Sequence, residues 1–219
     1  MTRWLHNFLK GDAVLVSILV LSLSGLAVLG AIVWRAGAPV PAPLPTPPPA
    51  YTLSVSEDEK SIRIEGAIEL GITAALSELL DDIGDVGVLE LQSGGGRVPE
   101  ARGLIRLVTE HQLATVARGD CLSTCALVFM AGSPRRMEDG ARLGFHSYAL
   151  NMPVVSTLMD VSAEQARDMA GFLARGIDGA FLDRIVATPP ENMWFPSRHL
   201  LLEAGVLTEP PVNAADTIP

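Results

Sequence analysis

A long uncharged run near the N-terminus, from Ala13 to Trp34, divides this chain into two parts of different chemistry. At the rise of an α-helix, the run is long enough to cross a hydrocarbon core of about 30 Å. We therefore predict one transmembrane helix over residues 13–34, with residues 1–12 on one side of the membrane. The folded domain must then be built from the residues that follow the run.

Positive charges around the run predict its orientation. Arg3, Lys10 and the α-amino group precede it and are opposed by Asp12, whereas Arg35 alone follows it closely. By the positive-inside tendency, residues 1–12 face the cytoplasm and the rest of the chain lies outside it.

A cleaved signal peptide is the alternative, because Ala36, Gly37 and Ala38 resemble a small-residue cleavage site. The apolar run exceeds the usual signal core of about 7–15 residues, and Pro39 directly after the candidate site hinders cleavage. The length of the run therefore favours a retained anchor.

We predict that residues 35–50 form a linker and that residues 51–219 form one domain. From Ala36 to Ala50 the chain is uncharged and dense in proline, which favours an extended, semi-rigid spacer. The remainder has the size of one domain and enough aliphatic residues to bury a core.

The charge of the predicted domain argues against two kinds of partner. Subtracting Asp12 from the 25 acidic residues, and Arg3, Lys10 and Arg35 from the 16 basic ones, leaves 24 acidic and 13 basic residues, a formal charge of −11. Nucleic acid is therefore not an expected partner. The same charge gives no help in docking to anionic lipid, so membrane attachment is assigned to the N-terminal helix.

Hydrophobic runs in residues 51–219 alternate between a strand period and a helix period, which predicts an α/β fold with a largely parallel, covered sheet. The first two predicted strands flank a charged turn and form an opening hairpin. Strands are predicted at Tyr51–Val55, Ile62–Ile68, Gly87–Leu91, Ala114–Ala117 and Leu143–Ser147, and helices at Ile72–Ile83, Pro99–Glu110, Ser123–Met130, Ser162–Ala187 and Ser197–Ala204. A capping box at Ser162 starts the fourth helix, and Gly205 ends the last one.

Three short segments carry the chemistry. Gly94, Gly95 and Gly96 follow a predicted buried strand, where parallel sheets gather their binding loops. Ser123 lies where a loop enters an apolar helix, and His146 lies on a strand. Backbone N–H groups, a hydroxyl and an imidazole are the parts that acyl transfer needs, so the combination predicts a serine hydrolase site.

Each of these segments also has a plain structural explanation. The glycines alone would form a tight turn, and the lysine and hydroxyl of a phosphate-binding loop do not follow them. A serine at a helix start is most often an N-cap. A strand histidine such as His146 is commonly satisfied by a backbone carbonyl. The chemical interpretation depends on the three segments occurring together.

The ordered motifs resemble the Clp protease/crotonase superfamily. They are L-x-L-x-S-x-G-G-x-V, then a helix, then x-S-x-x-A at a helix start, then G-x-H on a strand, and they span about Val88 to Leu207. The chain looks most like membrane-tethered periplasmic Clp-protease-like proteins with a C-x-S-x-C-A motif. The resemblance implies a repeated ββα spiral domain, anchored in a bacterial inner membrane by one helix, with the domain in the periplasm or outside the cell.

The resemblance also implies roles for single residues. Ser123 is the expected nucleophile and His146 its general base. The oxyanion is expected to bind at Gly95 and Gly96, where Gly96 donates its N–H, and at the N–H of Thr124.

The third triad position is less well matched. Counting back from the segment that begins at Glu203 lands on Met193, a shift of one residue reaches Asn192, and a shift of two reaches Glu191. We assign Asn192, which can orient an imidazole but stabilises imidazolium less than a carboxylate does. The resemblance is therefore compatible with low activity or with none.

Membrane-bound relatives in this superfamily use a serine–lysine dyad, but the two lysines of this chain are poorly placed for it. Lys10 lies across the predicted membrane, and Lys60 belongs to a charged turn. His111 and His199 are expected on the surface near helix ends, which leaves His146 as the base.

Cys121 and Cys125 are the only cysteines and flank Ser123. Outside the cytoplasm they can form a disulfide if the turn brings their Cα atoms within about 7 Å, which would stiffen the turn. The alternative is that Cys125 packs in the core as a small apolar residue. No metal site is expected, because no further His or Cys lies nearby to complete one, and no cofactor is predicted.

The sequence therefore predicts hydrolysis of an amide or ester through an acyl-enzyme, with a peptide or protein as the expected substrate, bound as an added strand. A homo-oligomer is expected from the superfamily. Two alternatives remain open: an inactive scaffold or binding module that keeps the fold, and a crotonase-like acyl-CoA enzyme, which the extracytoplasmic location argues against.

Overall fold

The computed structural model describes residues 50–149 and 160–208, which belong to one compact unit, Pro48–Pro219. The predicted membrane helix at residues 13–34 and nearly all of the linker at 35–50 lie outside the described residues. Within the described ranges, no helix combines the length and the apolar character that crossing a membrane requires.

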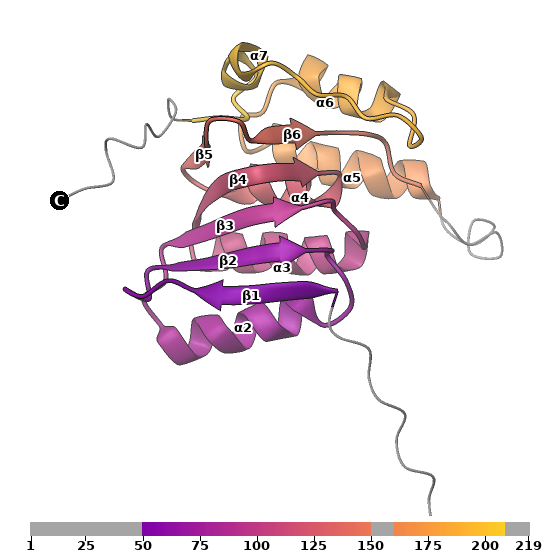
Figure 1. Cartoon of the computed structure of the whole chain (residues 1–219). Coiled ribbons are helices and arrows are strands. Elements are labelled where there is room, and N and C mark those ends of the chain that lie inside the picture. The colour runs from indigo at the N-terminus through magenta and orange to yellow at the C-terminus, as the bar shows by residue number, and fades with distance from the viewer. Residues whose placement is uncertain (1–49, 150–159, 209–219) are drawn as a thin grey trace, which may run out of the picture. The chain divides into compact units, whose positions relative to one another are not determined.

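A mixed sheet of six strands forms the centre of the domain, with the order β1-β2-β3-β4-β5 and with β6 also paired to β4 (Figure 1). β1 and β2 are antiparallel and all other pairs are parallel, so the predicted hairpin and the parallel-rich α/β sheet are confirmed. The strands are β1 Tyr51–Val55, β2 Ser61–Gly66, β3 Val88–Ser93, β4 Ala114–Leu122, β5 Arg135–Met137 and β6 Arg142–Gly144.

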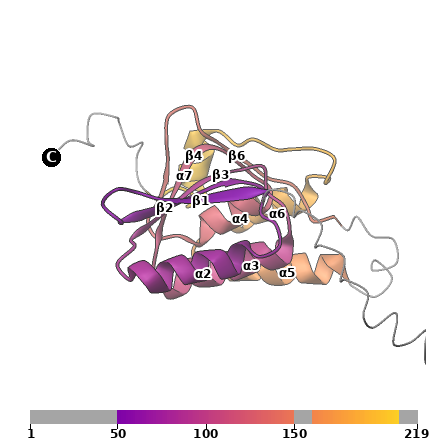
Figure 2. The same cartoon turned by 60° about the horizontal axis from the view of Figure 1, so that its bottom comes forward.

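Helices cover one face of this sheet, and Figure 2 shows α2, α3 and α5 on the same side of it. The strands are apolar toward this layer: Ile62, Ile64, Leu89 and Leu91 are fully buried. Burial of such side chains is the main favourable term in folding. The helices are α2 Ile72–Ile83, α3 Val98–Glu110, α4 Thr124–Ala131, α5 Val161–Leu173, α6 Gly179–Ala187 and α7 Arg198–Glu203.

α4 is the central helix, because every one of its residues is buried. It is apolar all round, as expected for a helix enclosed on all sides rather than lying at a surface. The turn that leads into it is therefore fixed by the core of the domain.

The other face of the sheet carries charged side chains. Glu90 on β3 is 9% exposed, accepts a hydrogen bond of 2.9 Å from Arg63 Nε on β2, and pairs with Arg118 on β4. Arg118 in turn pairs with Glu138. Burial alone would raise the pKa of Glu90, but the hydrogen bonds from Arg118 and Arg63 hold this pKa below its ordinary value.

The single long helix predicted from Ser162 to Ala187 is wrong, because the structure divides it into α5 and α6. Between them Gly176 adopts a φ of +85°, and the side chain of Asp178 accepts from the N–H of Phe181 to start α6. A left-handed glycine ends a helix, and an aspartate N-cap begins the next. The periodic pattern continues across this break and hides it.

The predicted capping box at Ser162 is also wrong. Asp160 is the N-cap of α5 and accepts from the N–H of Ala163 over 3.0 Å. Both predicted ends of α7 are confirmed. Ser197 caps its start, and Gly205 follows its last turn with a φ of +69°.

Several strands differ from their predicted extents. The strand predicted at Leu143–Ser147 is β6, which ends at Gly144, so the prediction that His146 lies on a strand is wrong and His146 follows the strand instead. β4 continues to Leu122, beyond the predicted end at Ala117, and its pairing with β3 shifts register between Leu91 and Ser93. Such an irregularity re-aims the strand that contains it. β5 was not predicted, because Arg135, Arg136 and Met137 do not alternate between apolar and polar residues.

Candidate active site

Ser123 lies on a sharp turn between β4 and α4. Its backbone angles are φ 55° and ψ −122°, and its side chain makes no capping hydrogen bond to the helix. A non-glycine residue with positive φ costs free energy and persists where the surroundings enforce it, often at a functional site. A strained strand-to-helix turn is also how α/β-hydrolases expose their nucleophilic serine. The hydroxyl is therefore free for chemistry and does not serve as an N-cap.

The glycine loop after β3 packs directly against this turn. Gly95 is buried with a φ of +93°, and a Cβ placed on it would lie 2.8 Å from the Cβ of Ser123 and 2.7 Å from the carbonyl oxygen of Leu122. The loop comes this close because Gly95 has no side chain.

Gly96 lies at the pocket beside Ser123, held by the segment that precedes α2. Ile68 forms an isolated bridge with Gly96, and a Cβ on Gly96 would lie 2.2 Å from the carbonyl oxygen of Ile68. The N–H of Ile68 donates to the carbonyl of Gly95 over 2.9 Å, and the N–H of Arg97 to that of Ile68 over 2.8 Å. The loop is thus fixed on both sides of Gly96.

His146 is held in place by its two neighbours. Phe145 exchanges two hydrogen bonds of 2.9 Å with Trp194, and the N–H of Ser147 donates to the carbonyl of Thr188 over 2.8 Å. The partly buried imidazole between them is anchored by main-chain contacts to the C-terminal part of the domain.

The Nδ1 atom of His146 lies 2.7 Å from the carbonyl oxygen of Ser147. Because a carbonyl oxygen only accepts, Nδ1 must carry the proton in this bond. In the neutral ring the lone pair is then on Nε2, and this is the tautomer that a general base needs.

Ser123 and His146 line one pocket of about 140 Å³. It lies at the carboxyl ends of parallel strands, where α/β sheets characteristically bind ligands. Gly96 and Thr124, two of the predicted oxyanion residues, also line it, together with apolar side chains and one tyrosine: Val98, Leu127, Phe145, Tyr148, Ala149 and Ile185. Gly95 lies behind this wall, against Ser123.

The structure does not bring Asn192 to this pocket. Its side chain is exposed, as is that of Glu191, and neither residue lines the cavity. Met193 instead packs near Gly144, where a Cβ would lie 2.8 Å from the sulfur of Met193. The hydrogen-bond partner of the imidazole is the Ser147 carbonyl, and spacing alone could not have identified a main-chain partner.

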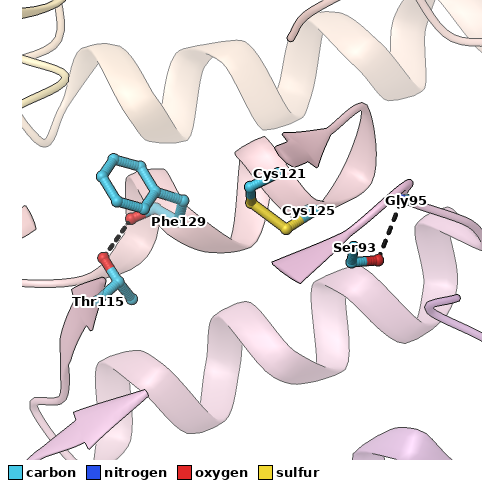
Figure 3. Close-up of a disulfide and its surroundings, with 6 residues drawn as sticks. All are labelled: Ser93, Gly95, Thr115, Cys121, Cys125 and Phe129. Carbon is cyan, nitrogen blue, oxygen red and sulfur yellow. Dashed lines mark hydrogen bonds between the residues drawn. A yellow bond between two sulfur atoms is a disulfide. The ribbon is translucent and has the colours of Figure 1, made fainter. Parts of the chain in front are cut away.

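Cys121 and Cys125 form a disulfide across the turn, with a Cα–Cα distance of 5.1 Å (Figure 3). Both cysteines are fully buried. The bridge joins the end of β4 to the first turn of α4 and therefore encloses Ser123. Figure 3 also shows Ser93 near this bridge, where its hydroxyl accepts from the N–H of Gly95 over 3.0 Å and holds the glycine loop.

Thr124 has a buried hydroxyl without a partner. The residue is 3% exposed, and its Oγ1 makes no hydrogen bond within the described part of the chain. It is the first residue of α4, so its N–H belongs to the group that has no acceptor inside the helix. A helix N-terminus favours negative charge beside it, which suits an oxyanion.

Tyr148 lines the pocket, although no sequence pattern indicated it. Its hydroxyl donates to Asp168 over 2.8 Å, and Arg102 contacts the same carboxylate with Nε and Nη2 at distances of 2.8 to 3.1 Å. Burial and the bond to Asp168 raise the pKa of Tyr148 well above its ordinary value. The contacts join α3 and α5, and no sequence signal links these three residues.

Lys60, His111 and His199 do not line the Ser123 pocket. Lys60 pairs with Asp85, and it lines a larger hollow of about 580 Å³ on the charged face of the sheet. His111 and His199 are exposed, as predicted, and His199 lies 3.1 Å from Glu203. Within residues 50–149 and 160–208, no group of three His, Cys, Asp or Glu side chains is placed to hold a metal ion.

No protein-family model and no curated protein matches this chain.

Proposed function

We propose that the chain is a serine hydrolase of the Clp protease/crotonase type, anchored by residues 13–34 with residues 51–219 outside the cytoplasm. The observation that carries the proposal is the strained turn at Ser123, which shares a pocket with His146 and touches Gly95. A hydroxyl, a base in a suitable tautomer and a helix N-terminus meet at one place, and acyl transfer uses all three.

In the proposed reaction, Ser123 Oγ attacks the carbonyl carbon of an amide or ester while His146 Nε2 takes its proton. The oxyanion lies between the N–H groups of Gly96 and Thr124, and His146 then gives the proton to the leaving group. Water attacks the acyl-enzyme by the same route in reverse. The Ser147 carbonyl takes the part of the third triad member by holding the Nδ1 proton of His146.

A peptide or protein is the proposed substrate, since an extended chain can add as a strand beside the glycine loop. The proposed enzyme is a homo-oligomer, as the resemblance implies, and uses no cofactor.

An inactive scaffold is the second candidate, because none of the described residues that line the pocket of His146 carries a carboxylate. A carbonyl orients imidazole but stabilises imidazolium less than a carboxylate does, so the reaction would be slower than in a full triad. The scaffold predicts that the fold persists with no activated serine.

Fluorophosphonate labelling of the full-length protein distinguishes the serine hydrolase from the inactive scaffold, because the probe reacts with an activated serine whatever the substrate. We expect labelling of the wild type and its loss in Ser123→Ala and His146→Ala. Ser77→Ala on α2 and His199→Ala on α7 are the matched controls and should label like the wild type. A folded wild type without labelling would favour the scaffold.

The proposed orientation has its own test. A reporter that is active only outside the cytoplasm, fused after Ala50, should be active. Activity of a cytoplasmic reporter at the same point would contradict it.

A further inference from the structure

A second hollow lies next to the Ser123 pocket and shares Tyr148 with it. Its volume is about 430 Å³. The two cavities are lined by successive residues of α6, since Ile185 lines the Ser123 pocket and Val186 lines the second hollow. Tyr148 and this part of α6 therefore belong to the walls of both cavities.

Gln165, on α5, contributes a buried amide to the second hollow. The residue is 4% exposed, and its Oε1 accepts from the main-chain N–H of Tyr148 over 3.1 Å. Because a main-chain N–H can only donate, this bond fixes which amide atom is oxygen. The two hydrogens of Nε2 are then left over, and Nε2 makes no hydrogen bond to any described residue.

An unpaired buried donor is unfavourable for folding and rare in native proteins. The bond to the N–H of Tyr148 uses only the Oε1 atom of Gln165 and does not require a free donor beside it, so the unpaired Nε2 needs an explanation. The missing partner must be an acceptor, because the free atom is a donor.

The rest of the lining indicates the chemistry of this acceptor. Val161, Ala166 and Val186 supply apolar surface, Ser147 and Ser162 supply hydroxyls, and none of the lining residues in the described part of the chain is charged. An uncharged oxygen on a partly apolar group fits these surroundings better than a carboxylate or a phosphate.

We propose that this hollow is a substrate subsite, in which Gln165 Nε2 donates to an uncharged carbonyl oxygen beside an apolar group of the chain acylating Ser123. The assignment of the ligand as a substrate rests on the proposed function. An amide carbonyl of a peptide has the required chemistry, whereas a plain hydrocarbon acyl chain lacks the acceptor.

Two fluorophosphonate probes of equal arm length test the subsite on the full-length protein. One arm contains an amide carbonyl and the other is a plain alkyl chain. We expect the wild type to label faster with the amide probe, by about threefold to tenfold, the usual value of one net hydrogen bond. Gln165→Glu keeps the acceptor for Tyr148 and replaces the free donor with an oxygen, so the rate ratio should fall to about one.

Gln165→Leu removes the whole amide and should lower the rate ratio in the same way. Gln92→Glu, an exposed glutamine on β3, is the matched control and should keep the wild-type ratio. Circular dichroism establishes that each variant is folded, and Gln165→Glu carries the test if the leucine variant is not. An unchanged ratio in folded Gln165→Glu would overturn the subsite.

Failure of the proposed function gives a different result from failure of the subsite. If neither probe labels the wild type, binding is measured by the nuclear magnetic resonance signals of the Gln165 side-chain amide during addition of N-acetylvaline methylamide. A saturable shift, absent in a titration with a hydrocarbon of similar size, supports the subsite without hydrolysis. No shift overturns it.

Discussion

The main-chain N–H of Ser123 donates a hydrogen bond of 2.8 Å to the carbonyl oxygen of Gly144, two residues before His146. This bond continues the parallel pairing of β4 with β6, in which Leu122 is the register partner of Gly144. The hydroxyl and the imidazole are therefore placed at the ends of neighbouring strands by strand register. Strand register sets the position of Ser123 relative to Gly144, and the bonds of Phe145 to Trp194 and of Ser147 to Thr188 then hold the segment after β6 that contains His146.

Replacing Gly95 with alanine should disrupt the turn at Ser123. The new Cβ would lie 2.8 Å from Ser123 Cβ and 2.7 Å from a carbonyl oxygen, at a φ of +93°. We expect a loss of about 1–3 kcal/mol in the free energy of unfolding and loss of fluorophosphonate labelling.

Gly94→Ala is the control for this prediction, because a Cβ on Gly94 would meet nothing within 4 Å. Denaturant unfolding and labelling of both variants should separate the two neighbouring glycines. Equal behaviour of the two variants would show that close approach at Gly95 is unimportant.

Asn192→Ala should leave fluorophosphonate labelling within about twofold of the wild type, since a change at an exposed position away from the pocket is expected to have little effect. The side chain is exposed, and His146 Nδ1 already has the Ser147 carbonyl as its partner. Nitrogen chemical shifts of the imidazole should also report the Nδ1-protonated tautomer in both proteins. A tenfold loss of labelling would restore Asn192 as the third triad member.

The disulfide should stabilise the domain by about 2 kcal/mol, the chain-entropy value for so short a loop. We expect this loss of unfolding free energy in the double variant Cys121→Ala, Cys125→Ala. Because both cysteines are fully buried, the folded protein should show no reactive thiols even with mild reductant, and two after denaturation in reductant. Thiol labelling of the folded protein without reductant would contradict the bridge.

The sequence predicted those helices and strands whose apolar residues recur at a regular helix or strand spacing. The opening hairpin, the parallel sheet and α2 follow patterns that a buried face imposes on each element. The break between α5 and α6 was missed because it depends on Gly176 and Asp178, whose local effects compete with a periodic pattern that continues past them. Local turn chemistry decided the outcome there.

The positions of the candidate site residues were also predictable in part. A glycine loop and a serine at a helix start, both following strands, were expected to meet at one end of a parallel sheet, and Gly95 and Ser123 do touch. The partner of His146 was not predictable, because a main-chain carbonyl leaves no trace in the sequence. Tyr148 and Gln165 were missed for a related reason, since their roles depend on how α5 packs.

Glu90 should make the stability of the domain sensitive to acid. Its pKa is lowered in the folded protein by Arg118 and Arg63, so folding is favoured when the carboxylate is charged. This contribution is fully present above the unfolded pKa of about 4.3 and is lost as pH falls through the lower folded value. We expect Glu90→Gln to lose roughly 1–3 kcal/mol at neutral pH and to show a weaker decline in acid.

Glu65→Gln is the matched control for Glu90, because its side chain is 46% exposed and lies 3.7 Å from Arg63. An exposed pair of this kind contributes at most about 1 kcal/mol. Urea unfolding from pH 7 to pH 3 should distinguish the two variants. An acid decline in Glu90→Gln as steep as in the wild type would assign the pH dependence to other groups.

Two buried threonines should respond in opposite ways to replacement by valine. The hydroxyl of Thr115 donates to the carbonyl of Phe129 over 2.7 Å, as Figure 3 shows, whereas the hydroxyl of Thr124 has no partner among the described residues. Thr115→Val removes this hydrogen bond, although the Phe129 carbonyl still accepts from the N–H of Gly132 over 3.2 Å, so we expect a cost of about 0.5–1.5 kcal/mol. Thr124→Val removes a hydroxyl that is already unpaired, so stability should hold or rise by about 1 kcal/mol.

The Thr124 variant also separates the two ways in which this residue can serve the site. Valine keeps the main-chain N–H that the proposed oxyanion site uses, so labelling of Thr124→Val should stay within about threefold of the wild type if only that N–H matters. Stability measured by denaturant unfolding together with the labelling rate gives two independent readings. A stable variant with labelling reduced a hundredfold would mean that the hydroxyl itself contacts the reacting group, which would also explain why it is left unpaired.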